Sequence, residues 1–268
     1  MEKLQAALQK ARQSRDGQPV TREPAKPSRK RPDSVDKLWE MLPSFDVSEE
    51  QLEAQRIFTR IAGTKATPFD ILRTKILLQM RQNGWKRIAI TSPMPQSGKT
   101  TMACNLALGL GRQSDLRTIV LDLDLRDPSV SNFLNVVPEH GIDELLTGKV
   151  QFEEQAMKFG HNVAFSMAKI PDADPTRLLL AEETNDVLDA IEAQFQPDIM
   201  IFDLPSVLVN DDTRAFLKNV DCALIVLRAN KTRYGQFDTC EKEIAEHTNV
   251  LGVILNAYRY SEAGKSGE

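Results

Sequence analysis

The sequence SPMPQSGKTT at residues 92–101 decides the fold. It follows a short apolar run at 87–91 that is typical of a buried strand, and it leads into residues 100–110, whose spacing predicts a helix. A loop between a strand and a helix presents backbone N–H groups and a helix N-terminus to the oxygens of an anion. Lys99 would then reach the β- and γ-phosphates of a nucleotide, and the Thr100 hydroxyl would ligate Mg²⁺.

This loop departs from the strict G-x-x-x-x-G-K-[ST] pattern, because Pro93 stands at the position of the first glycine. Taken alone, the loop is therefore also compatible with an ordinary helix N-terminus that binds nothing. If it binds phosphate, the residues expected around the nucleotide are Pro95, Gln96, Ser97, Gly98, Lys99, Thr100 and Thr101.

Carboxylates follow two further strand-like runs. Residues 118–121 lead into DLDLRDP, which begins with Asp122 and Asp124, and residues 199–202 lead into Asp203. Each aspartate alone could cap a helix. In doubly wound sheets, however, ligands bind outside the carboxyl ends of the strands, and three carboxylates beside a lysine need a cation there. Mg²⁺ bridging phosphates supplies one, so the sequence predicts a nucleotide-phosphate site.

The rest of the chain from residue 68 alternates strand-like and helical segments. Near-continuous apolar strands with helices between them indicate an α/β fold, a doubly wound and mostly parallel sheet with helices on both faces. The expected strands are at 87–91, 118–121, 163–167, 199–202, 223–227 and 250–255, and the expected helices at 69–81, 100–110, 183–195, 212–219 and 237–247.

Three parts are expected along the chain: residues 1–45, the domain at 46–260 and a polar tail at 261–268. Residues 1–45 begin with a short helical stretch and continue into a basic, proline-rich linker. Between residues 10 and 31 the chain has eight cationic side chains against two acidic ones, and this composition predicts disorder. Residues 35–42 form an apolar cluster that either packs on the domain or waits for a partner.

Composition excludes several functional classes. The net charge is −4, so the remainder of the chain is acidic once the basic linker is set aside, which argues against a nucleic-acid partner. The longest strongly apolar stretch is far too short to span a bilayer, and no secretory signal is visible. Three widely spaced cysteines and three scattered histidines favour neither disulfides nor a zinc site. A cytoplasmic protein is expected, peripheral at the inner membrane only through a partner.

The three motifs together resemble those of the bacterial tyrosine kinases (BY-kinases) of capsule and exopolysaccharide synthesis. In that family S-x-x-P-x-x-G-K-T, D-x-D-x-R-x-P and apolar-D-x-P are the Walker A, Walker A′ and Walker B motifs, and the likeness covers about residues 66–258. The resemblance implies a P-loop NTPase fold. The related partition and cell-division ATPases lack the R-x-P and carry a signature lysine where this chain has Met94, so they are a less favoured alternative.

By resemblance, the ligands are ATP and Mg²⁺. Lys99 and Thr100 would hold phosphate and metal, and Asp203 would help to position the metal. Asp122 and Asp124 would divide metal coordination and acceptance of the proton from the incoming tyrosine hydroxyl, with Asp124 favoured as the base.

The resemblance assigns two further residues. Arg126 would neutralise charge near the phosphates or hold the carboxylates in place, and Asn256 at a strand end would contact the adenine. It also implies a partner, the cytoplasmic segment of a membrane polysaccharide co-polymerase, and a protein tyrosine as substrate. That substrate includes the chain itself, at Tyr258 or Tyr260.

Two departures separate the chain from the family pattern. It has three tyrosines in all, whereas family members usually end in a tyrosine cluster. The oligomer-forming E-x-x-R-x-x-R motif would read Thr67, Asp70 and Arg73, so only its last position survives. The main hypothesis is an ATP-dependent protein-tyrosine (auto)kinase that regulates polysaccharide polymerisation or export, with nucleotide-dependent homo-oligomers. The alternative is an ATP-dependent switch or adaptor of the co-polymerase that phosphorylates nothing.

Overall fold

A single sheet organises the computed structural model, which describes residues 32–169 and 174–258. The predictions for residues 1–31, for Tyr260 and for the 261–268 tail lie outside the described residues. Within them, strands pair in the order β1-β4-β5-β3-β6-β2-β7-β8, all parallel except β4 with β5, which confirms the mostly parallel sheet. The strands are β1 Ser44–Phe45, β2 Arg87–Ser92, β3 Thr118–Asp122, β4 Met157–Phe159, β5 Val163–Ser166, β6 Ile199–Ser206, β7 Cys222–Arg228 and β8 Asn249–Asn256.

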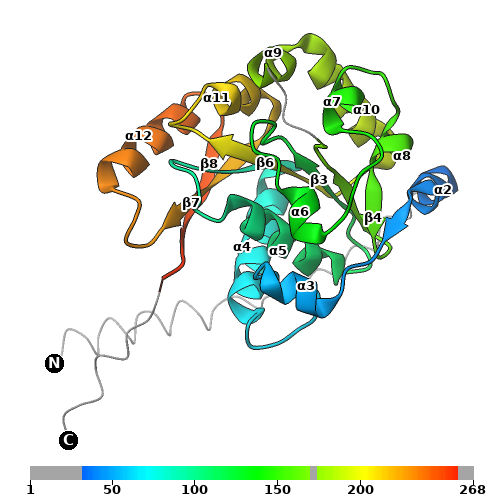
Figure 1. Ribbon diagram of the computed structural model, residues 1–268, viewed down its shortest axis with the longest axis horizontal. Coiled ribbons are helices and arrows are strands. Elements are labelled where there is room, and N and C mark those ends of the chain that lie inside the picture. Colours follow the sequence, from blue (N-terminus) through cyan, green and yellow to red (C-terminus); the bar gives the residue numbers. More distant parts are fainter. Residues whose placement is uncertain (1–31, 170–173, 259–268) are drawn as a thin grey trace, which may run out of the picture. The chain divides into compact units, whose positions relative to one another are not determined.

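Helices cover both faces of this sheet, as predicted (Figure 1). Alternate side chains of a strand point to opposite faces, so Ile88 and Ile90 of β2 join one core and Ala89 joins the other. The first core lies under α3 Glu49–Ala54, α4 Thr67–Asn83, α5 Lys99–Gly111 and α6 Val130–Leu134. The second lies under α2 Asp33–Met41, α7 Ile142–Leu146, α8 Phe152–Gln155, α9 Pro175–Leu180, α10 Glu182–Phe195, α11 Asp212–Phe216, the 3-10 turn η1 Leu217–Asn219 and α12 Tyr234–Ala245.

Helix α5 is the central element of the first core. Eleven of its thirteen residues are buried, as expected for a helix that is apolar on nearly every side. Its one buried amide, Asn105, is fully used: Oδ1 accepts from the Phe58 N–H at 2.9 Å, and Nδ2 donates to the carbonyls of Arg56 and Thr101 at 2.9 and 2.8 Å. These bonds tie the second turn of α5 to the chain at 56–58.

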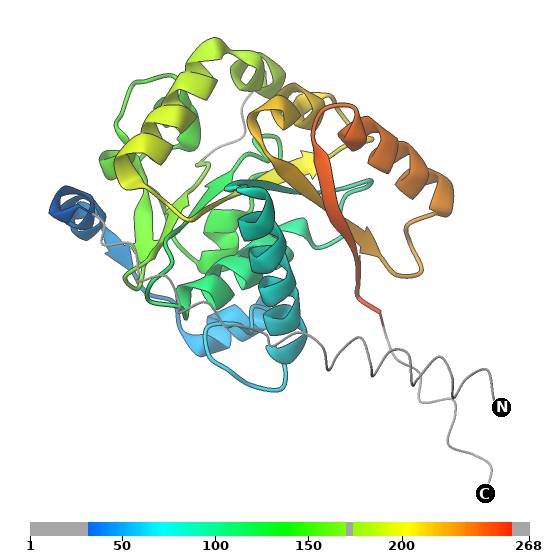
Figure 2. The same ribbon diagram turned by 180° about the vertical axis from the view of Figure 1, so that it is seen from behind.

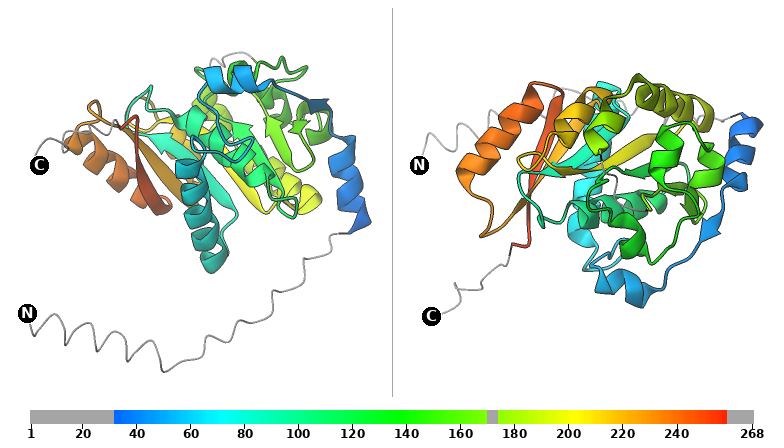
Figure 3. Two further views of the ribbon diagram at one scale, coloured as in Figure 1. Left: turned by 90° about the horizontal axis from the view of Figure 1, so that it is seen from below. Right: turned by 45° about the horizontal axis from the view of Figure 1, so that its top comes forward.

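Residues 33–45 pack on the domain, which resolves the alternative left open for residues 35–42. Trp39 of α2 is 2% exposed, and its Nε1 donates to the Phe195 carbonyl at 2.8 Å. Strand β1 then extends the sheet beside β4, at the end opposite to β8 (Figures 2 and 3). The compact unit begins at Asp33, so the boundary expected at residue 46 lies inside it.

The three cysteines lie in the protein interior. Cys104, Cys222 and Cys240 are buried and free. Burial raises the pKa of the Cys222 and Cys240 thiols to about 12, which keeps them protonated and unreactive.

None of the helices in 32–169 and 174–258 is long and apolar enough to cross a bilayer.

Candidate functional site

The loop at 93–98 joins β2 to α5 at the carboxyl end of the sheet. Gln96 and Gly98 have left-handed backbone, with φ of 59° and 91°. The φ of Gly98 is one that side chains rarely adopt, so the conformation favours glycine here. A Cβ atom at this position would lie 2.2 Å from Nδ2 of Asn256, and that side chain would have to move. The second glycine of the Walker pattern is therefore kept for a steric reason.

Two serine hydroxyls form hydrogen bonds within the same loop. Ser92 and Ser97 both donate from Oγ to the Met94 carbonyl, each at 2.8 Å. These two bonds turn the chain tightly at the point where Pro93 replaces the first Walker glycine. The departure from the strict pattern therefore leaves a compact loop at the N-terminus of α5.

Two carboxylates lie side by side behind the loop. Asp122 at the end of β3 and Asp203 in β6 are register partners on neighbouring strands, and both are fully buried. Oδ2 of Asp203 accepts from the Thr100 hydroxyl at 2.6 Å, whereas Oδ2 of Asp122 accepts from the backbone N–H groups of Ser129 and Val130 at 3.3 and 3.1 Å. The Oδ1 atoms of both aspartates are buried with no hydrogen-bond partner among the described residues.

The site has excess negative charge. Burial raises the pKa of Asp203 to about 6, and burial together with the charge of Asp203 raises the pKa of Asp122 well above its ordinary value. Burial also raises the pKa of Asp124, although the charge of Lys99 opposes this shift. The Nζ atom of Lys99 lies 3.6 Å from Oδ2 of Asp124. One lysine faces three carboxylates, so a second cation would stabilise the site.

The donor set fits Mg²⁺ bound together with a nucleotide. The Thr100 hydroxyl and the unpartnered oxygens of Asp122 and Asp203 are the hard oxygen donors that Mg²⁺ prefers. Within the described part of the chain, no group of three His, Cys, Asp or Glu side chains could hold a metal ion. Mg²⁺ characteristically uses one or two carboxylates and completes its shell with phosphate oxygens and water.

A cavity of about 420 Å³ lies over the loop and brings most of the predicted residues together. Asp124 lines it and is partly accessible, whereas Asp122 does not line it. Ser97, Asp203 and Asn256 also lie outside the lining, although Asp203 is one hydrogen bond away through Thr100. The predicted residues that line it are Pro95, Gln96, Gly98, Lys99, Thr100, Thr101, Asp124 and Arg126.

Arg126 has a partner that the sequence did not reveal. Its Nε and Nη2 donate to the two carboxylate oxygens of Asp212 at 2.6 and 3.0 Å, and Asp212 also accepts from the Thr176 hydroxyl. The hydrogen bonds of the guanidinium thus go to Asp212, rather than to the two carboxylates of its own motif. Asp212 is nearly fully buried, so this bidentate pair fixes Arg126 at the cavity wall.

Two more contacts at the site were not predicted. The Ser129 hydroxyl lies 3.0 Å from the Thr100 hydroxyl, and Nη1 of Arg228 donates to the Gln96 carbonyl at 2.7 Å. Ser129 directly follows the DLDLRDP motif, so adjacency to a motif was a usable signal. Arg228 ends strand β7, and its position at a strand end was the only signal available.

Asn256 contacts the loop itself. Its Nδ2 donates to the Ser97 carbonyl at 2.9 Å, and its Oδ1 accepts from the Ala257 N–H at 2.8 Å. These bonds place Asn256 at the edge of the phosphate loop. The adenine contact expected for it stays a prediction.

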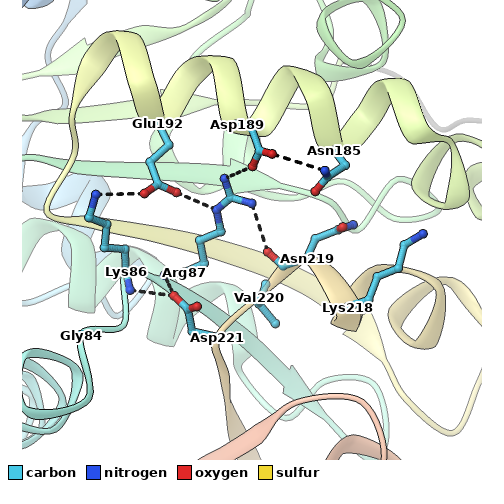
Figure 4. A pocket seen from close by; sticks show the side chains of 10 residues that line it. All are labelled: Gly84, Lys86, Arg87, Asn185, Asp189, Glu192, Lys218, Asn219, Val220 and Asp221. Carbon is cyan, nitrogen blue, oxygen red and sulfur yellow. Dashed lines mark hydrogen bonds and ion pairs between the residues drawn. The ribbon is translucent and has the colours of Figure 1, made fainter.

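A second cavity, of about 400 Å³, lies at the opposite ends of β2 and β7 (Figure 4). Four of its charged side chains pair with one another: Lys86 and Arg87 each contact Glu192 at 2.9 Å, and Arg87 also contacts Asp189. Asp221 accepts from the backbone N–H groups of Lys86 and Arg87. This network ties α10 to the starts of two strands, and we assign it a structural role.

The chain resembles known proteins in both sequence and fold. No family model matches the chain. It is 28% identical to tyrosine-protein kinase YwqD of Bacillus subtilis, over 73% of this chain and 82% of YwqD. It is 27% identical to tyrosine-protein kinase etk of Escherichia coli K12 over 69% of this chain, and 28% identical to the succinoglycan biosynthesis transport protein ExoP of Rhizobium meliloti over 66%.

The matched lengths differ among these relatives. The aligned part spans 25% of etk and 23% of ExoP. The solved kinase domain of the Escherichia coli tyrosine kinase ETK superposes with a TM-score of 0.69 at 25% identity, covering 75% of this chain and 78% of that domain. The P-loop NTPase fold predicted from the motifs is confirmed.

Proposed function

Because the chain is a homologue of the bacterial tyrosine kinases, we propose that it is an ATP-dependent protein-tyrosine kinase of exopolysaccharide or capsule synthesis. Its partner would be the cytoplasmic segment of a membrane polysaccharide co-polymerase. The observation that carries the kinase step is the placement of Asp124, which lines the cavity beside Lys99 while Asp122 is buried behind it.

The proposed roles follow from accessibility and charge. Lys99 would move from Asp124 to the phosphates on Mg·ATP binding. Thr100, Asp203 and Asp122 would hold the metal, which would supply positive charge beside the phosphates. Asp124 then accepts the proton of the tyrosine hydroxyl. The tyrosine oxygen forms a bond to the γ-phosphorus, the bond from that phosphorus to the β–γ bridging oxygen breaks, and ADP leaves. The raised pKa of Asp124 suits proton acceptance.

The residues at the oligomer-motif positions are engaged inside the domain. Asp70 pairs with Arg73 at 3.1 Å and with Arg112 at 2.8 Å, and Arg73 donates to the Gly109 carbonyl of α5 at 2.8 Å. The Arg73 guanidinium therefore already has partners within its own chain. This observation favours weak self-assembly of the isolated protein.

Autophosphorylation of the isolated protein is accordingly expected to be weak and to rise with protein concentration. Tyr258 is exposed and lies two residues beyond β8, and at no more than about 3.5 Å per residue the chain after Asn256 reaches only a closely placed neighbour. If phosphotyrosine forms, Tyr260 is the expected main acceptor, since it is farther from the strand. Tyr234→Phe is a matched control, because it removes an exposed tyrosine that lies on α12 and not in the segment after β8. The yield of phosphotyrosine should stay unchanged in this variant.

The experiment uses γ-labelled Mg·ATP with and without the partner's cytoplasmic segment, followed by mass spectrometry of phosphotyrosine. The kinase hypothesis expects phosphotyrosine that increases when the partner segment brings copies together. Abundant, concentration-independent phosphotyrosine without a partner would contradict the assembly requirement. Tight Mg·ATP binding with no phosphotyrosine under any condition would favour the switch instead.

A further inference from the structure

Two side chains from neighbouring strands hold the phosphate loop from one side. Arg228 at the end of β7 and Asn256 at the end of β8 are register partners. Arg228 donates from Nη1 to the Gln96 carbonyl at 2.7 Å, and Asn256 donates from Nδ2 to the Ser97 carbonyl at 2.9 Å. Two consecutive carbonyl groups of the loop are therefore bound by one pair of strand ends.

These contacts fix the direction of the loop's backbone. In a trans peptide the N–H points away from the C=O, so carbonyls drawn toward β7 and β8 turn the next two N–H groups away from those strands. Gln96 adopts a left-handed φ that is uncommon for a side chain other than glycine, and such a conformation needs support from its surroundings. Gly98 allows Asn256 to approach within the space that a Cβ would fill.

We propose that Arg228 and Asn256 are positioning residues, a latch that holds the phosphate loop in the shape that binds nucleotide. This inference rests on the proposed Mg·ATP site and adds to it the strand ends of β7 and β8. The latch residues contact the phosphate loop and not the adenine base of the nucleotide. The latch therefore differs from the adenine contact expected for Asn256.

Mg·tripolyphosphate separates the two roles, because it carries the phosphates without a base. Calorimetry would compare its affinity and that of Mg·ATP for the wild type, Arg228→Met and Asn256→Ala. Loss of one latch bond should weaken the binding of both ligands about tenfold, since the loop loses either the charge-assisted bond from Arg228 or the partly buried bond from Asn256. Lys231→Met is the matched control: it removes the same charge from an exposed side chain three residues away, and both affinities should stay within about twofold.

Amide hydrogen exchange gives a readout that needs no ligand. Exchange at residues 94–98 should accelerate in both latch variants while α5 keeps its protection, whereas Lys231→Met should match the wild type. Unchanged exchange and unchanged affinities in Arg228→Met would overturn the latch. If the variants lose affinity for Mg·ATP alone, the latch is also overturned, and the substituted residue is assigned a contact with the adenine base. Failure of the wild type to bind either ligand would instead refute the proposed function.

Discussion

Asp203→Asn is expected to stabilise the nucleotide-free protein while it removes Mg²⁺-dependent turnover. The pKa of Asp203 is raised to about 6 by burial, whereas an unfolded aspartate titrates near 4. The folded state therefore binds more protons between about pH 4 and 6, and stability falls as the pH rises through that window. At pH 7 the buried charge costs about 3 kcal/mol, which asparagine would remove while still accepting the Thr100 hydrogen bond.

Thermal unfolding in EDTA without nucleotide measures this effect. The midpoint of Asp203→Asn should exceed that of the wild type at pH 7, and the difference should shrink toward pH 4. Asp122→Asn should likewise raise the unfolding midpoint and lower Mg²⁺-dependent turnover, because burial also raises the pKa of Asp122. Asp186→Asn, at an exposed position of α10, is the control and should leave the midpoint unchanged. A lower midpoint for Asp203→Asn at pH 7 would contradict the assignment of a buried, cation-requiring charge.

Lys99→Ala is expected to weaken Mg·ATP binding at least tenfold. Lys99 is 8% exposed and lies beside Asp124 in the cavity. Arg126, which also lines the cavity, is paired with Asp212 and is therefore not expected to replace Lys99. Removal of Lys99 also leaves the carboxylates without their nearest positive charge, which increases repulsion of the anionic nucleotide. Wild-type binding is expected in the micromolar range, about −8 kcal/mol at 1 μM.

Isothermal calorimetry with Mg·ATP provides the comparison. Lys231→Ala is the matched control, because it removes an exposed lysine from the same end of the sheet and should retain the wild-type affinity. Equal affinities for the wild type and Lys99→Ala would refute the phosphate-loop assignment.

Features fixed by local pattern could be predicted from the sequence. The strands β2, β3, β6 and β7 each contain an apolar run, and in three of them the motif residues come directly after that run. Parallel strands place their carboxyl ends at one edge, so Lys99, Asp122 and Asp203 had to meet there. The short β1 and β4, with two and three residues, are too brief to carry a periodic signal.

Features set by long-range contacts could not be predicted. Arg126 meets Asp212 across 86 residues of sequence, and Arg228 meets Gln96 across 132. Neither pairing follows from spacing, because each depends on how helix α11 or strand β7 is placed against the loop. The position of Trp39 under α10 was likewise open, since an apolar turn can pack on its own domain or on a partner.

The most direct test of the kinase proposal is the rate of phosphotyrosine formation by Asp124→Asn at saturating Mg·ATP, measured beside its nucleotide affinity. The assay contains a tyrosine peptide and the partner's cytoplasmic segment. We expect phosphotyrosine from the wild type and a rate at least about 100-fold lower from Asp124→Asn at nearly unchanged affinity, because only the proton acceptor is lost. If Asp124→Asn abolishes ATP binding while Asp122→Asn spares it, the roles of the two aspartates are exchanged. Absence of phosphotyrosine from the wild type, or an undiminished rate from Asp124→Asn, would contradict the proposed mechanism.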